Sequence, residues 1–108
     1  MPQYMTQFAY TPEAWAALVA NPVDRSEPLR ALVEKLGGRL ISFHYTMGKW
    51  DGVLVTEAPD EATATAAILA AISAGHLKAT RMTRLIPVSE AMEAMRKAQG
   101  VTYKAPSR

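Results

Sequence analysis

The sequence predicts one α+β domain in which strands and helices follow the order β-α-β-β-α-β, with a further helix near the C-terminus. Its length of 108 residues is enough for one domain with a single core and too short for two. Four runs of β-branched and aromatic residues predict strands. The stretches between them carry apolar residues three and four positions apart, which is the pattern of amphipathic helices.

The first strand is predicted at Gln3 to Tyr10, where aromatic, β-branched and amide residues nearly alternate. A helix should follow it, because Thr11 is a typical N-cap and Pro12 suits the first helical position. Asn21 precedes a proline and therefore avoids helical dihedral angles. We expect this first helix to end there.

A second helical segment is predicted next, with Ser26 as its N-cap. Its large apolar residues fall at helical spacing and form one stripe: Leu29, Leu32, Val33 and Leu36. The segment should stop at Gly37 and Gly38, because glycine readily adopts the left-handed conformation in which many helices end.

The second and third strands are predicted at Arg39 to Met47 and at Trp50 to Glu57, with only Gly48 and Lys49 between them. Strands joined so closely must pair antiparallel, as a hairpin. Alternation along the second strand places its side chains on two faces. One set is Ser42, His44 and Thr46, and the other is Ile41, Phe43, Tyr45 and Met47.

Two more helices and a strand are predicted in the C-terminal half. Asp60 should cap a helix that ends at Gly75, and Leu77 to Ile86 alternates as a fourth strand. Ser89 to Lys97 predicts the last helix, with Met92, Met95 and Ala98 on one side. We expect residues 1–98 to form the domain and residues 99–108 a flexible tail.

This order of elements is that of the ferredoxin-like fold, a four-stranded antiparallel sheet with helices on one face. The other face would be bare. The apolar strand residues expected to contribute to it are Tyr4, Phe8, Phe43, Val53, Val55 and Met82. Such an area is too large for a monomer, so we predict a homodimer or higher homo-oligomer, paired sheet to sheet as a dimeric α/β barrel.

Composition argues against several functional classes. The net charge of +2 is small, and no long basic tract could follow a nucleic-acid backbone. The predicted third strand has one aromatic residue and two acids, so it lacks the base-stacking pattern of RNA-recognition motifs. The longest apolar stretch is short and alanine-rich, and the N-terminus has no signal-peptide pattern. We therefore expect a cytoplasmic protein that binds neither nucleic acid nor membranes.

No metal site or cofactor is predicted. The chain has no cysteine, and its two histidines, His44 and His76, are far apart in the sequence without a nearby cluster of acids. No serine has the glycine-rich setting of a nucleophile elbow.

The stretch Gly48-Lys49-Trp50-Asp51, followed by Gly-Val-Leu-Val-Thr-Glu-Ala-Pro-Asp, resembles the hairpin of the GYD domain family. The resemblance extends from Pro2 to about Lys97. It implies a ferredoxin-like protomer of the dimeric α/β-barrel type, and the family has no generally agreed activity. Trp50 stands where that family usually has tyrosine, and an indole N–H can donate a hydrogen bond but cannot accept one.

Asp51 and Trp50 each have two explanations. As a turn residue, Asp51 could accept hydrogen bonds from the amides of Gly48 or Lys49, or pair with an arginine of the fourth strand, Arg81 or Arg84. As a site residue, it could transfer a proton or anchor a ligand. Trp50 could be a packed aromatic residue or a stacking platform.

His44 belongs to a polar row that could line a cavity or lie on a solvated edge strand. In a pocket it would be the natural acid or base, because imidazole titrates near neutral pH. His76 follows a helix end and is expected to be a loop residue or to interact with the C-terminal end of the helix dipole.

Three functions follow from the sequence. The first is a homodimeric protein that binds a small molecule between sheet and helices or inside the dimer barrel, with a site lined by Tyr4, His44, Trp50, Asp51 and Arg81. The second is a cofactor-free oxygenase or isomerase in which His44 or Asp51 is the catalytic residue that moves a proton. The third is an assembly module without a ligand. Whether the protein is an enzyme stays open on the sequence.

Overall fold

A four-stranded antiparallel sheet with strand order β2-β3-β1-β4 organises the chain. The computed structural model describes residues 1–106. The elements are β1 (Gln3–Tyr10), α1 (Pro12–Ala20), α2 (Ser26–Lys35), β2 (Arg39–Tyr45), β3 (Gly52–Glu57), α3 (Glu61–Ser73), β4 (Leu77–Leu85) and α4 (Val88–Ala98). Their order and pairing confirm the predicted α+β, ferredoxin-like arrangement.

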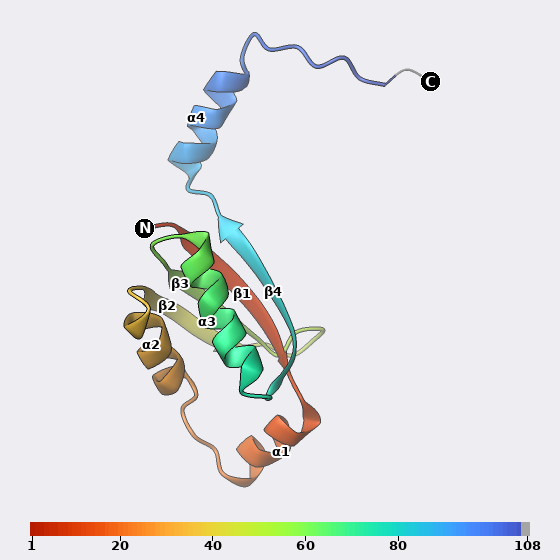
Figure 1. Cartoon of the computed structure of the whole chain (residues 1–108). Coiled ribbons are helices and arrows are strands. Elements are labelled where there is room, and N and C mark those ends of the chain that lie inside the picture. The colour runs from red at the N-terminus through yellow and green to blue at the C-terminus, as the bar shows by residue number, and fades with distance from the viewer. Residues whose placement is uncertain (107–108) are drawn as a thin grey trace.

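The helices α2 and α3 lie across one face of the sheet (Figure 1). The short helix α1 lies beyond the end of β1, and α4 projects away from the sheet at the end of β4. No helix among residues 1–106 covers the opposite face, which we call the open face. No helix in this part of the chain combines the length and hydropathy needed to span a bilayer.

Most predicted helix ends are confirmed. The Thr11 hydroxyl accepts a hydrogen bond from the Ala14 amide at 3.2 Å, and the Asp60 carboxylate accepts one from the Thr63 amide at 2.8 Å. The predicted cap at Ser26 is wrong. Ser26 is the first residue of α2, and its own amide donates to the Asp24 carboxylate at 2.9 Å. An acid two residues upstream therefore takes the role expected of the serine.

The β2–β3 hairpin has a longer loop than predicted. The strands end at Tyr45 and begin again at Gly52, so Trp50 and Asp51 belong to the loop and not to the third strand. Thr46 closes this loop, because its amide donates to the Asp51 carbonyl at 2.8 Å and its hydroxyl donates to the Trp50 carbonyl at 2.6 Å. These bonds take the place of the two-residue turn that the sequence suggested.

The predicted composition of the bare face is wrong for four of its six residues. Tyr4 packs with Ala64 of α3 and with Met82, so both strand residues face the helices. Phe8 and Phe43 pack together in the core on the same side. Of the residues predicted to be bare, Val53 and Val55 alone lie on the open face, because alternation along β3 places them opposite buried Leu54.

A bulge interrupts the alternation of side chains along β2. The register shifts between Leu40 and Ser42, so Ile41 is the extra residue. Leu40 therefore faces the helices, where it is buried, although simple alternation would group it with Ser42 and His44. Beyond the bulge the predicted alternation holds, with Phe43 toward the helices and His44 toward the open face.

An aromatic cluster fills the core at the end of the sheet near the hairpin. The ring of Phe8 lies 5.1 Å from that of Tyr10 and 5.5 Å from that of Phe43, and Trp15 of α1 contacts Tyr10 edge-on at 5.2 Å. Gly52 lies beneath the Phe8 ring, so closely that a Cβ atom there would collide with it. The glycine is therefore what allows the ring to lie flat on the sheet.

Glu57 on the open face forms an ion pair that makes stability depend on pH. Arg39 donates to its carboxylate at 2.9 Å and Gln3 at 3.5 Å, and these hydrogen bonds, that from Arg39 first, lower the pKa of Glu57. A carboxyl with a lowered pKa stabilises the fold above its unfolded pKa, here about 4.5, and this stabilisation is lost as the pH falls through the folded value.

We therefore expect Glu57→Gln to lower the melting temperature slightly near neutral pH, and the difference from the parent protein to disappear as the pH falls below about 4.5 and Glu57 becomes protonated. Thermal unfolding of both proteins across this range measures the gap, which should close below about pH 4.5. A gap that does not change with pH would mean that the ion pair contributes nothing.

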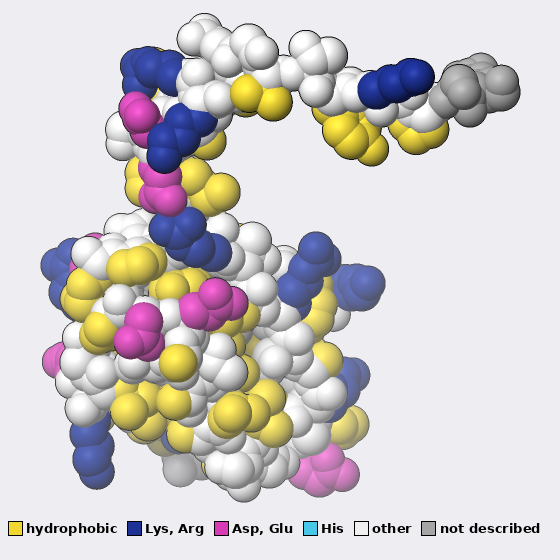
Figure 2. All heavy atoms as spheres, turned by 45° about the horizontal axis from the view of Figure 1, so that its top comes forward, with side chains coloured by type: hydrophobic (Ala, Val, Ile, Leu, Met, Phe, Trp, Pro, Cys, Tyr) yellow, Lys and Arg dark blue, Asp and Glu magenta, His cyan; other side chains and the backbone are white. Residues whose placement is uncertain are grey.

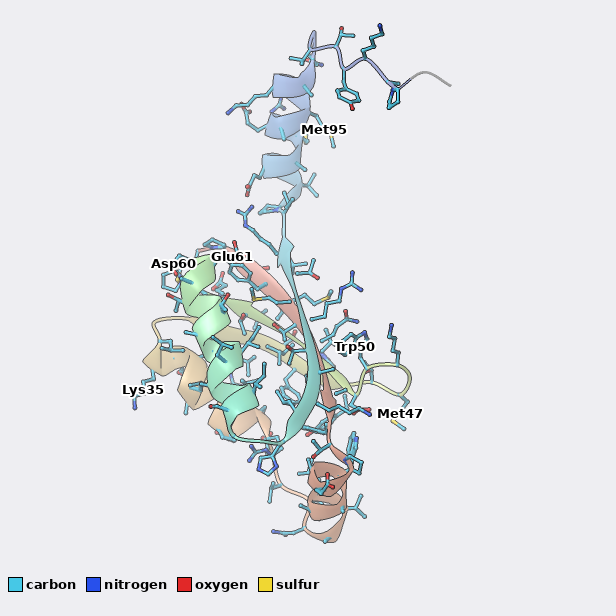
Figure 3. The ribbon with its side chains drawn as sticks, turned by 45° about the vertical axis from the view of Figure 1, so that its right-hand side comes forward. Lys35, Met47, Trp50, Asp60, Glu61 and Met95 are labelled. Carbon is cyan, nitrogen blue, oxygen red and sulfur yellow. The ribbon has the colours of Figure 1, made fainter. Side chains whose placement is uncertain are left out.

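The helix α4 has no buried residue. Val88, Met92 and Met95 recur at helical spacing on it, and their exposed fractions are 75%, 44% and 64%. Figure 2 shows this projecting part of the molecule with its apolar side chains uncovered, and Figure 3 places Met95 far from the sheet. Residues 99–106 beyond it contain no helix or strand, and the last two residues of the predicted tail lie outside the described part of the chain.

Candidate functional site

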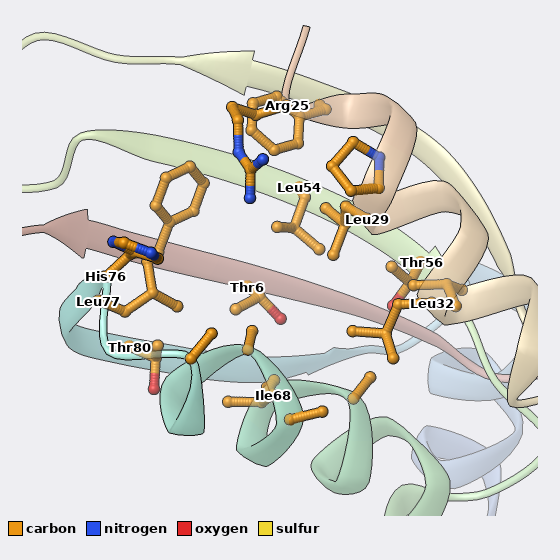
Figure 4. A pocket seen from close by; sticks show the side chains of 18 of the residues that line it. Thr6, Arg25, Leu29, Leu32, Leu54, Thr56, Ile68, His76, Leu77 and Thr80 are labelled. Carbon is orange, nitrogen blue, oxygen red and sulfur yellow. The ribbon is translucent and has the colours of Figure 1, made fainter. Parts of the chain in front are cut away.

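A cavity of about 260 Å³ lies between the sheet and the two helices that cover it. Side chains from β1, β3 and β4 form its floor, and side chains from α2 and α3 form its walls (Figure 4). The volume is near the lower end of the range of small-molecule sites. The space between the sheet and the helices is one of the two locations in which the sequence predicts a pocket.

The walls of the cavity are apolar. Leucines of α2 and small residues of α3 face each other across it, and the alanines of α3 leave the space that larger side chains would fill. The main apolar lining residues are Leu29, Leu32, Val33, Leu54, Ala67, Ile68, Ala71 and Met82. Such a surface favours an apolar ligand body.

Two threonines place hydroxyl groups inside this apolar cavity. Thr6 and Thr56 are 5% and 8% exposed, and they are the buried polar residues of the described chain. Both line the cavity. Buried polar groups normally have a hydrogen-bonding partner, so a hydroxyl directed into a cavity marks a point where a bound molecule or water can be held.

The end of the cavity near the last residues of β1 is polar. The hydroxyl of Tyr10 lies 3.3 Å from that of Tyr45. Burial raises the pKa of Tyr10 well above its ordinary value, and the bond to Tyr45 adds to this, while the nearby Arg25 guanidinium acts in the opposite direction. Tyr10 is therefore a neutral phenol that can donate a hydrogen bond. His76 lines the same end and is tied to it, because its carbonyl accepts from the Thr11 amide at 3.0 Å.

The five residues predicted to form a ligand site are not brought together, and none of them lines this cavity. Tyr4 is buried near the start of α3, in contact with Ala58 and Ala64. Trp50 and Asp51 lie in the hairpin loop, which extends well away from α3 (Figure 3). Their roles as site residues stay predictions.

His44 and Arg81 lie on the open face. They occupy one row across the sheet, because His44 pairs with Val53, and Gln7 pairs with both Val53 and Arg81. They stand on opposite edge strands, about 14 Å apart at the usual strand spacing. His44 is exposed, which fits a solvated edge strand and not a cavity lined within one chain.

Asp51 is tied to the backbone of β1. Its carboxylate accepts a hydrogen bond from the Tyr10 amide at 2.8 Å, and its own amide donates to the Phe8 carbonyl at 2.8 Å. The backbone ladder between β1 and β3 ends at the Phe8–Gly52 pair, so the carboxylate supplies the acceptor where β3 turns away. The predicted partners, which were turn amides or a strand-four arginine, are wrong; Arg84 instead pairs with Glu90 at 3.1 Å.

The residues that line the cavity were missed because they look like core positions in the sequence. Thr6 alternates with Tyr4, Phe8 and Tyr10 on the buried side of β1. A hydroxyl residue within an otherwise aromatic buried face was the available signal. The sequence around Arg25 contains no comparable signal, because Arg25 lies in a polar stretch between two helices.

Within residues 1–106, no three His, Cys, Asp or Glu side chains lie close enough together to hold a metal ion. The chemistry available at the cavity is therefore hydrogen bonding from hydroxyl groups, one guanidinium and one imidazole, over apolar walls.

The model of the GYD domain matches residues 4–95. The chain belongs to the GYD domain family. This match includes every strand and helix of the sheet-and-helix layer, and it reaches into α4. The resemblance drawn from the hairpin sequence is thereby confirmed.

This GYD domain is 32% identical over 90 residues to a protein of Thermus thermophilus named glutamine synthetase and cystathionine beta-lyase binding protein. The matched part is 83% of this chain and 94% of that protein. The name states what the Thermus protein binds. The similarity therefore extends along nearly the whole relative and is not confined to a motif.

Two solved structures share the fold. The crystal structure of MtbAldR matches with a TM-score of 0.56 and 16% identity, over 80% of the GYD domain chain and 52% of its own. The chain thus spans about half the length of MtbAldR. The crystal structure of FFRP-DM1 matches with a TM-score of 0.50 and 13% identity, over 80% of this chain and 100% of its own. At such identities these likenesses show the fold alone.

Proposed function

We propose that this GYD domain is a homo-oligomeric binding protein that holds a small molecule in the cavity between the sheet and α2 and α3. The observation that carries the proposal is the position of the two buried polar residues, Thr6 and Thr56, both of which line that cavity. Valine would fill the same space without a hydroxyl to satisfy, so a core with no ligand would favour valine there.

Mass spectrometry under native conditions tests this proposal on the purified chain. We expect a co-purified small molecule, and we expect Ala71→Leu to lose it, because Ala71 lines the cavity and a leucine would fill the space. Ala66→Leu is the matched control, since Ala66 lies on the same helix but is exposed and outside the lining. Equal ligand content in all three proteins would contradict the proposal.

We also propose that two copies pair through the open face. No helix of the described chain covers it, and the partly exposed side chains of Met5, Val53 and Val55 lie at its centre. Burial of such apolar area is the main driving force for association. Sedimentation equilibrium should give a dimer or larger oligomer that Val55→Arg dissociates; a monomeric parent protein would contradict this pairing.

The alternative of an oxygenase or isomerase draws no support from the geometry. The two candidate proton carriers, His44 and Asp51, do not share a cavity, and the Asp51 carboxylate is engaged by the Tyr10 amide. Proton transfer requires a group within hydrogen-bonding reach of a bound substrate.

A second candidate function is binding to another protein, and the Thermus relative favours it. The exposed stripe of α4, made of Val88, Met92 and Met95, is the surface we propose for such contacts. Surface plasmon resonance with glutamine synthetase and cystathionine β-lyase from the organism of this chain tests it directly. We expect binding that Met92→Glu abolishes and that Glu93→Gln on the polar side of the same helix preserves. Absence of binding to either enzyme would contradict this candidate.

A further inference from the structure

We propose that the ligand of the cavity is a small anionic amphiphile, a monocarboxylate with an apolar body, whose carboxylate binds at Arg25. This inference rests on the proposed small-molecule function of the cavity and names the chemical class of its ligand. It follows from the distribution of charge and polarity along the cavity.

Arg25 lines the cavity and carries a permanent positive charge, and His76 is the other lining residue that can become cationic. No aspartate or glutamate is among the residues that line it. Arg25 is exposed, so solvent screens part of its charge, but because no acid lines the cavity the potential at this end stays positive and favours an anion.

Arg25 and Tyr10 both line the cavity, and while burial raises the pKa of Tyr10, Arg25 lies close enough to act in the opposite direction. The His76 carbonyl accepts a hydrogen bond from the amide of Thr11, the residue after Tyr10. The three polar groups therefore gather at one end of the cavity. Figure 4 shows Arg25 reaching from the start of α2 across this end, with His76 on the same side. A phenol that stays protonated can donate to the anion that the guanidinium holds.

Beyond the polar end, Leu29 and Leu32 of α2 face Leu54 and Ile68 across the cavity, so an apolar body is favoured there. Thr6 lies four residues along β1 from Tyr10, about 13 Å at the usual rise of a strand. A ligand whose head group lies at Arg25 would therefore place its body among these apolar side chains, toward Thr6.

The volume of the cavity, about 260 Å³, is near the lower end of the range of small-molecule sites, so the ligand is small. A guanidinium presents two parallel N–H donors that match the two oxygens of a carboxylate. A single carboxylate would therefore balance the charge of Arg25, the one permanently charged residue that lines the cavity.

Isothermal titration calorimetry of the full chain with three probes of equal length tests the proposal. The probes are octanoate, octan-1-ol and octylammonium. We expect octanoate to bind most tightly and octylammonium most weakly. We expect Arg25→Gln to weaken octanoate binding about tenfold or more, which is the loss expected for one charge-assisted hydrogen bond, and to leave octan-1-ol binding unchanged. Arg30→Gln is the matched control, because Arg30 is an exposed arginine of α2 outside the lining.

The outcomes separate this inference from the function on which it rests. If octan-1-ol or octylammonium binds the parent protein as tightly as octanoate, or if Arg25→Gln binds octanoate normally, the anionic class is wrong while the cavity remains a binding site. If none of the probes binds and Ala71→Leu has the same ligand content as the parent protein, the proposed function itself fails.

Discussion

Replacement of Gly52 by alanine is expected to lower the free energy of unfolding by about 1–3 kcal/mol, the usual penalty of overpacking a core. A Cβ atom at this position would lie closer to the Phe8 ring than real Cβ contacts allow. The ring cannot move away freely, because Phe8 is buried and packs against Tyr10 and Phe43. Urea denaturation followed by circular dichroism measures the loss.

Two further variants establish the cause of that loss. Gly48→Ala is the matched control, because no atom lies within 4 Å of the Cβ it would add, and it should leave stability nearly unchanged. Phe8→Leu should cost less in the Gly52→Ala background than in the parent protein, since the smaller side chain relieves the collision. Additive effects of the two substitutions would show that the ring is not the obstacle.

Replacement of Asp51 by alanine is expected to cost about 1–3 kcal/mol, which is the penalty for leaving a buried amide without its acceptor. The amide is that of Tyr10, which now donates to the Asp51 carboxylate at 2.8 Å. Asp51→Asn keeps an acceptor oxygen and should cost less. Besides global stability, hydrogen exchange of the Tyr10 amide, followed by NMR, reports on this bond alone, and it should accelerate most in the alanine variant.

An Asn variant as unstable as the Ala variant would mean that the negative charge, and not the acceptor, stabilises this end of β1. Unchanged exchange at Tyr10 in both variants would contradict the structural role of Asp51. It would then favour the predicted role of this residue in binding or proton transfer.

The sheet and its helices could be predicted because local chemistry and tertiary structure agree there. Thr11 and Asp60 cap helices in the structure as their side chains suggest, and Gly37 and Gly75 end helices with positive φ angles of 86° and 88°. In a chain whose strands are rich in β-branched and aromatic residues, these boundaries are enough to specify the order of elements.

The faces of the strands were harder to predict, because they depend on long-range pairing. The bulge at Ile41 reverses the face of Leu40, and nothing in the local sequence marks it. Tyr4 and Phe8 could have faced either the helices or the open face. Alternation divides the residues of a strand into two sets but does not determine which set contacts the helices.

The candidate site was missed for a related reason. Histidine and aspartate residues such as His44 and Asp51 are recognisable in a sequence as groups that can carry chemistry, while the cavity depends on small residues of α3 and on two threonines in the core. Missing volume has no signature in a single sequence, because an alanine such as Ala71 is also an ordinary helix former.

Because α4 projects from the sheet, we expect the helix content of this protein to depend on its concentration. A helix of 11 residues is only marginally stable alone in water, and α4 has no buried residue within its own chain. We therefore expect contact of the methionine-bearing side with another surface to stabilise its turns further. The ellipticity at 222 nm per residue should then become more negative as the protein is concentrated or as a partner is added.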